Sequence, residues 1–170
     1  MNNDLLYQLA LTQIPGIGEV HAKTLINFFG DAHSIFNASK KQLENVEGIG
    51  TLKATSIKSF TDFTLCEEEI AFIEKYRITP IFITSENYPK RLLNCYDSPT
   101  ILFYRGNADL NASKIISIVG TRNHTEYGKY ICEKLVGDLK DQDILIISGL
   151  AFGVDTIAHK AALKNNLQTV

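Results

Sequence analysis

The sequence of 170 residues is 45% apolar and 21% charged, a composition typical of one large or two small globular domains. Its formal net charge of −2 argues against nucleic-acid binding through a broad basic surface, so any such binding must use local sites. It has no apolar run long enough to span a membrane and no secretory-signal pattern, which predicts a cytoplasmic protein. Its three cysteines are far apart in the sequence, which predicts reduced thiols and no metal site.

Residues 1–75 predict a helical domain, because apolar residues recur at helical spacing and glycines mark the turns. Two stretches in it are alike: "IPGIGEVHAKTLINFFG" at 14–30 and "VEGIGTLKATSIKSF" at 46–60. Gly16 and Gly48 are 48 − 16 = 32 residues apart, a period that suits a pair of helical hairpins.

Each repeat contains Gly-Ile-Gly, which can join two helices closely because glycine has no side chain and adopts positive φ readily. The helix after such a turn begins with backbone N–H groups that can donate to a phosphate. The pattern resembles the helix-hairpin-helix motif of sequence-independent DNA-binding modules. The expected phosphate contacts are Gly16, Gly18, Lys23, Gly48, Gly50 and Lys53. A helical bundle whose turns only pack, or dock another protein, is the alternative.

After residue 75 the sequence favours short apolar strands. Strands are expected at 78–83, 100–106, 114–119 and 143–148, with turns and a short helix between the first two and helices at about 125–140 and 154–165. "LQTV" at the end of the chain begins one more strand. Apolar strands that alternate with helices predict a parallel sheet of the Rossmann-like kind, incomplete at Val170, so that the chain is expected to be a fragment.

The predicted fold class is therefore α/β. It combines an N-terminal all-α helix-hairpin-helix (SAM-like) domain, residues 1–75, with a partial Rossmann-like parallel-sheet domain, residues 76–170.

Ligands of such sheets bind beyond the carboxyl ends of the strands, where two loops are expected side by side. These are "GTRNH" (120–124, the GTRNH loop) and "GLAFGVD" (149–155, the GLAFGVD loop). Arg122 offers a planar, permanently charged fork for phosphate oxygens, with a surface ion pair as the alternative. Helix caps are predicted at Thr125 and at Asp155 or Thr156, and room for a bulky ligand is predicted beside Ser148, Gly149 and Gly153.

Other functions fit these loops less well. A dinucleotide site is disfavoured because the GTRNH loop lacks Gly-x-Gly-x-x-Gly and the second strand ends in Ser148 instead of an acidic residue. An ATPase is disfavoured because no strand is followed by the Gly-Lys-Ser/Thr of a P-loop. Asp155 and His159 lie four residues apart, but a helix cap and a hydrogen-bonded packing residue suit them better than an acid–base pair. Tyr127 is expected to pack, whereas Phe152 suits packing and base stacking equally.

"SIVGTRNHTEYGKY" and "IISGLAFGVDTIAHKAAL" together closely resemble the paired signature of the DprA/Smf family of DNA-processing proteins. "YPKRLLNCYDSPTILFYRGN" (88–107) is similar to the segment that precedes this signature in the family. The resemblance implies a non-enzymatic protein without a cofactor that binds single-stranded DNA and helps to load RecA onto it in natural transformation, competence and recombination. It also implies a homodimer, whose dimer interface is expected beyond Val170. The residues implied in DNA binding are Gly120, Thr121, Arg122, Asn123, Ser148, Gly149, Phe152 and Gly153.

The main alternative is a nucleotide phosphoribohydrolase of the lysine-decarboxylase-like type, which shares this kind of sheet and a similar first loop. Such an enzyme would carry a Pro-Gly-Gly-x-Gly-Thr stretch, and none occurs before Val170. The helix-hairpin-helix pattern and the GLAFGVD loop also argue against it.

Overall fold

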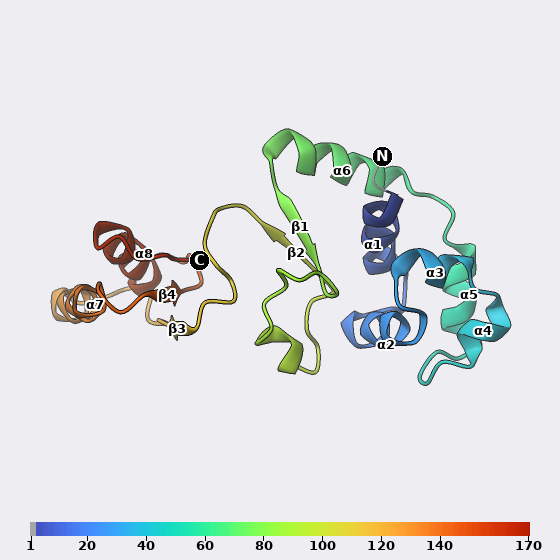
Figure 1. Cartoon of the computed structure of the whole chain (residues 1–170), viewed down its shortest axis with the longest axis horizontal. Coiled ribbons are helices and arrows are strands. Elements are labelled where there is room, and N and C mark those ends of the chain that lie inside the picture. Colours follow the sequence, from blue (N-terminus) through green and yellow to red (C-terminus); the bar gives the residue numbers. More distant parts are fainter. Residues whose placement is uncertain (1–2) are drawn as a thin grey trace. The chain divides into compact units, whose positions relative to one another are not determined.

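A computed structural model describes residues 3–170, with helices in the N-terminal part of the chain and short strands after residue 78 (Figure 1). The chain divides into two compact units, Met1–Arg105 and Gly106–Val170. Among the described residues, no helix combines the length and the apolar character needed to cross a bilayer. The helical region followed by a small parallel sheet confirms the predicted α/β class.

Six helices form most of the first unit. They are α1 (Asn3–Gln13), α2 (Glu19–Phe29), α3 (Ala32–Asn37), α4 (Lys40–Glu44), α5 (Thr51–Ser59) and α6 (Thr64–Tyr76). Two short helices begin at side-chain caps: Asp31 accepts from the N–H of Ser34 before α3, and Ser39 forms a capping box with Gln42 before α4. Leu9 and Ala10 of α1 pack with Cys66 and Ile73 of α6 in one buried cluster.

The 32-residue sequence repeat is also a structural repeat. Gly16 and Gly48 have φ of +82° and +78°, which the Gly-Ile-Gly turns require. In both turns the isoleucine N–H donates to the carbonyl three residues earlier, at 3.1 and 3.0 Å. The buried positions repeat as well, none more than 6% exposed: Ile14 and Val46, Ile17 and Ile49, Ala22 and Ala54, Leu25 and Ile57. The pairs α1–α2 and α4–α5 are therefore two helix-hairpin-helix units.

An antiparallel hairpin completes the first unit. Its strands are β1 (Thr79–Phe82) and β2 (Ile101–Tyr104), with the short 3₁₀ helix η1 (Leu92–Asn94) between them, and Thr79 lies opposite Tyr104. The loop before β2 is held by α2, because Glu19 accepts hydrogen bonds from the N–H and the hydroxyl of Thr100. The Lys23 ammonium donates to the carbonyl oxygens of Leu93 and Cys95 and to the Ser98 hydroxyl, at 3.2, 3.1 and 3.2 Å.

These contacts explain why the compact units divide at Arg105, whereas the sequence pattern changes near residue 75. The hairpin is bonded to α2, and its two strands form a sheet of their own. The division of this chain into a helical domain, residues 1–75, and a Rossmann-like domain, residues 76–170, stays a prediction.

The second unit contains the predicted alternation of strand and helix. Its elements are β3 (Lys114–Ser117), α7 (Glu126–Asp138), β4 (Ile144–Ile147) and α8 (Val154–Lys164). β3 and β4 are parallel, with Lys114 opposite Ile144 and Ser117 opposite Ile147. α7 and α8 pack side by side, and Val136, Ile146 and Ala158 are fully buried in the core between helices and strands (Figure 1).

The last residues of the chain run parallel to β4, as expected for the beginning of a further strand. The N–H of Ile146 donates to the carbonyl of Gln168 at 3.0 Å, and the N–H of Val170 donates back to the carbonyl of Ile146 at 3.0 Å. The N–H of Ser148 donates to the carbonyl of Val170 at 2.9 Å. These bonds place the chain end beside the strand that leads into the GLAFGVD loop.

Candidate functional site

The GTRNH and GLAFGVD loops follow β3 and β4 at the same edge of the parallel strands. Two hydrogen bonds join the segments that carry them. The hydroxyl of Ser148 donates to the carbonyl of Ile118 at 2.7 Å, and the N–H of Val154 donates to the carbonyl of Thr121 at 3.1 Å. The prediction that these loops lie side by side is confirmed.

Glycines allow this close approach. Gly153 has a φ of +90°, and a Cβ there would lie 2.2 Å from the carbonyl oxygen of Thr121 and 2.5 Å from that of Arg122. A Cβ on Gly149 would lie 2.8 Å from a carboxylate oxygen of Asp155. Neighbouring protein atoms thus occupy the space where a side chain at either glycine would lie, and the expectation that a bulky ligand approaches these positions stays a prediction.

Arg122 is exposed on a GTRNH loop whose backbone is fixed from two sides. The N–H of Asn123 donates to the hydroxyl of Thr121 at 3.2 Å. Val154 fills the space beside Gly120, where a Cβ would lie 2.6 Å from the Cβ of Val154. No hydrogen bond or ion pair engages the Arg122 side chain within residues 3–170, so the surface ion pair is not formed and the guanidinium donors are available to a ligand.

Thr125 links the GTRNH loop to α7, as predicted. Its hydroxyl accepts a hydrogen bond from the N–H of Gly128 at 3.0 Å, which fixes the direction of the first helical turn.

The start of α8 differs from the prediction. Its N-cap is Gly153, without any side-chain cap. The carboxylate of Asp155 instead accepts from the N–H of Gly149 at 3.1 Å, and the hydroxyl of Thr156 donates to the carbonyl of Ala151 at 2.7 Å. Both side chains turn back onto the GLAFGVD loop and stabilise it, because this loop has unpaired backbone groups within their reach.

His159 makes its own hydrogen bond, in agreement with the prediction. Its Nδ1 lies 2.7 Å from the hydroxyl of Thr169, whereas its buried Nε2 has no partner among the described residues, so it does not pair with Asp155. Within residues 3–170, no three His, Cys, Asp or Glu side chains are arranged to hold a metal ion.

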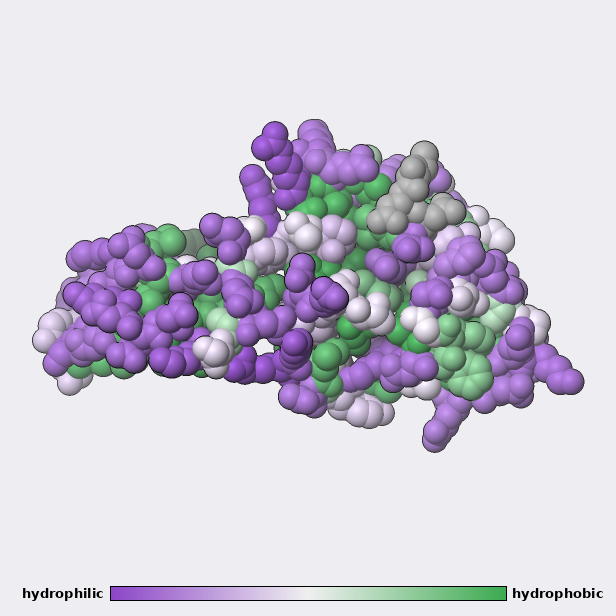
Figure 2. All heavy atoms as spheres, in the orientation of Figure 1, coloured by the Kyte–Doolittle hydropathy of each residue, from purple (hydrophilic) through white to green (hydrophobic). Residues whose placement is uncertain are grey.

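Exposed apolar and aromatic side chains lie in the two loops and directly beside them in the chain. Val119, Leu150 and Phe152 are 84%, 80% and 83% exposed. Tyr127 is 73% exposed, so the prediction that it packs is wrong. On the face shown in Figure 2, hydrophilic residues predominate in each unit, and smaller hydrophobic patches are scattered among these hydrophilic residues. Tyr130, 57% exposed, was missed by the sequence analysis, although its spacing of three residues from Tyr127 was an available signal.

In the first unit, the predicted lysines bond to protein atoms. Lys23 holds the loop before β2, and Lys53 donates to the carbonyl of Gly48 at 2.7 Å and contacts Nε2 of His21 at 2.8 Å. The N-cap residues of α2 and α5 are Gly18 and Gly50, so neither helix has a side-chain cap. The uncapped N–H groups are therefore better placed than the Lys23 ammonium to contact an anion.

The model of the family "DNA recombination-mediator protein A" matches residues 79–170, more than half of the chain, and a model of the helix-hairpin-helix motif matches residues 5–65. The chain belongs to the DprA/Smf family. Protein Smf of Synechocystis sp. is 30% identical over 99% of this chain and 44% of its own length. DNA processing protein DprA of Streptococcus pneumoniae is 34% identical over 64% of this chain and 43% of its own length.

The chain thus spans somewhat less than half the length of these two DprA/Smf relatives. The crystal structure of DNA processing protein A (DprA) from Streptococcus pneumoniae matches with a TM-score of 0.74 and 24% identity, over 96% of this chain and 56% of that one. This likeness shows that the two share a fold.

Proposed function

We propose that the GTRNH and GLAFGVD loops bind the backbone of single-stranded DNA. The observation that carries the proposal is the unpaired Arg122 side chain on a loop whose backbone is held by Thr121, Asn123 and Val154. A guanidinium donates two parallel hydrogen bonds to phosphate oxygens, and a loop that is already fixed loses little entropy when it binds.

A single strand fits these features better than a duplex. Phe152 is exposed in the GLAFGVD loop, where an unpaired base can stack on its ring, whereas a duplex buries the faces of its bases. The backbone N–H groups around Gly120 and Thr121 add neutral hydrogen-bond donors to the charged Arg122 guanidinium. Ser148, Gly149 and Gly153 support the proposal indirectly, because they position the two loops.

Membership of the DprA/Smf family gives the proposed setting. Relatives are named DNA processing proteins, and the family is described as a recombination mediator. We infer that the protein binds single-stranded DNA in the cytoplasm and assists the loading of RecA during natural transformation and recombination. The protein acts as a homodimer and without catalysis in this proposal. In this proposal the helix-hairpin-helix turns also contact DNA, through the backbone N–H groups that follow Gly18 and Gly50.

Fluorescence anisotropy of a labelled oligo-dT and a matched duplex tests the proposal. The intact protein should prefer the single strand, and Arg122→Ala should weaken binding by roughly ten-fold or more and reduce its dependence on salt. Lys164→Ala is the matched control, because it removes one exposed positive charge at the far end of α8. If the intact protein bound neither DNA, the proposal would be abandoned, and nucleoside monophosphate cleavage would be assayed instead.

A further inference from the structure

The outward face of α7 carries two exposed tyrosines and a lysine. Tyr127 and Tyr130 are three residues apart, and Lys134, also exposed, follows Tyr130 by four residues, so all three share one side of the helix. No hydrogen bond, ion pair or ring contact engages any of them within residues 3–170. The buried side of α7 is formed by Cys132 and Val136, so the core does not need these rings.

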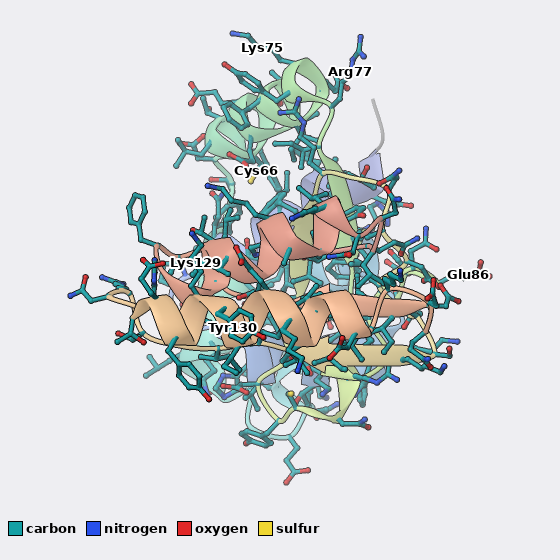
Figure 3. All side chains as sticks on the ribbon, turned by 90° about the vertical axis from the view of Figure 1, so that its left-hand side faces the viewer. Cys66, Lys75, Arg77, Glu86, Lys129 and Tyr130 are labelled. Atoms are coloured by element: carbon teal, nitrogen blue, oxygen red, sulfur yellow. The ribbon has the colours of Figure 1, made fainter. Side chains whose placement is uncertain are left out.

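The charges on α7 are unevenly placed around its axis. At about 100° per residue, Lys134 falls between the two tyrosines, whereas Glu126 and Glu133 fall together to one side. Lys129 is half-buried, and Asp138 lies one turn beyond Lys134. Figure 3 shows Lys129 and Tyr130 on different sides of α7. The exposed face therefore combines aromatic rings with the positive charge of Lys134, and the negative charge of Asp138 falls on the same side at the last turn of the helix, far from the GTRNH loop.

This face is continuous with the candidate site. The Thr125 cap fixes the first turn of α7 directly after the GTRNH loop, so Tyr127 follows Arg122 by five residues of ordered chain. Only the end of the GTRNH loop and the beginning of the first turn of α7 therefore separate Arg122 from Tyr127 along the chain.

We propose that a single DNA strand bound at the two loops continues along α7, with bases stacked on Tyr127 and Tyr130 and a phosphate near Lys134. This inference rests on the proposed function. Unpaired bases stack on aromatic side chains, and a nearby cation binds the backbone between them. A lysine between the two rings suits a polyanion with apolar bases better than it suits a purely apolar protein partner.

The test compares two ligands of equal length and charge: labelled oligo-dT, and an abasic oligonucleotide that keeps the phosphates. The double variant Tyr127→Ala/Tyr130→Ala of the intact protein should bind oligo-dT about ten-fold more weakly than wild type and bind the abasic strand equally well. Tyr127→Phe/Tyr130→Phe should retain affinity for oligo-dT, because phenylalanine still stacks. Tyr96→Ala, which removes a ring 79% exposed in the first unit, is the control.

The outcomes separate this inference from the proposed function. If the double alanine variant bound oligo-dT as tightly as wild type while Arg122→Ala did not, the inference would fail and the phosphate site would remain. If it lost affinity for the abasic strand too, or if the phenylalanine variant lost as much, stacking would be refuted. If wild type bound neither strand, both proposals would fail.

Discussion

The carbonyl oxygen of Thr121 accepts a hydrogen bond from the backbone N–H of Val154, and this 3.1 Å contact joins the GTRNH loop to the first residue of α8. The bond forms because Gly153 has no side chain to keep the two segments apart. Arg122, next in the chain, therefore projects from a backbone that is held in place before any ligand arrives. Such preorganisation lowers the entropic cost of binding.

Gly153→Ala should destabilise the second unit. The new Cβ would overlap the Thr121 carbonyl at 2.2 Å, and an L-residue is strained at a φ of +90°. We expect a loss of at least about 2 kcal/mol in the free energy of unfolding, measured by urea denaturation. Gly50→Ala, where φ is −75° and no atom lies within 4 Å, should cost about 1 kcal/mol or less. An unchanged urea midpoint for Gly153→Ala would contradict the close approach of the loops.

Lys23→Ala should loosen the loop before β2. Its ammonium satisfies three oxygens, two of them backbone carbonyls, and their loss of a charged donor should cost about 1–3 kcal/mol. Hydrogen exchange should show faster amide exchange in residues 92–98. The control is Lys40→Ala, which removes an exposed lysine at the start of α4 and should leave exchange there unchanged. Equal exchange in the two variants would refute this structural role for Lys23.

The stability of the first unit should depend on Asp31 at low pH. The hydrogen bond from the Ser34 N–H, supported by the Ser34 hydroxyl, lowers the pKa of Asp31 below its usual 3.8. A lowered folded-state pKa means that the stabilisation is complete above the unfolded pKa and is lost as the pH falls through the folded one. Asp31→Ala should therefore cost about 0.5–1 kcal/mol at pH 6 and less once the pH falls below the folded-state pKa, where the protonated carboxyl accepts from the Ser34 N–H more weakly.

Urea denaturation across this range measures the effect. Asp31→Asn is the matched control, because the amide oxygen can still cap α3 but does not titrate. A difference between wild type and Asp31→Ala that stayed constant with pH would show that the carboxylate charge is unimportant.

The three cysteines should differ in reactivity. Cys66 and Cys132 are buried, and burial raises the pKa of both thiols, which lowers the thiolate fraction at neutral pH. Cys95 is exposed. An aromatic disulfide reagent should therefore label one thiol quickly in the folded protein and all three in denaturant, and Cys95→Ser should abolish the fast phase. Rapid labelling of two or more thiols in the folded protein would contradict the burial.

Much of the fold follows from local sequence signals. The predicted helix at 125–140 is found at Glu126–Asp138, with the predicted cap at Thr125, because capping and helical periodicity act within a few residues. The adjacency of the GTRNH and GLAFGVD loops also follows, since parallel strands end at the same edge.

Contacts between distant residues could not be predicted in this way. Lys23 and Ser98 are 75 residues apart, and nothing near either residue indicates the other. The face of α7 was ambiguous for a different reason. Tyr127, Ile131 and Leu135 recur every four residues, as do Cys132 and Val136, and only tertiary packing decides which stripe is buried. The structure buries the stripe of smaller side chains and exposes the stripe of larger ones.

The repeat in the first unit has a consequence for its symmetry. His21 and Lys53 each lie three residues after the second glycine of their turn, 32 residues apart, so they occupy equivalent positions, and their side chains meet at 2.8 Å. Because a lysine has donors only, its counterpart at this meeting point must be an acceptor, and two identical lysines would repel each other. A lysine in both copies would therefore bring two ammonium groups together, so the contact between the two halves depends on the copies having diverged at this position.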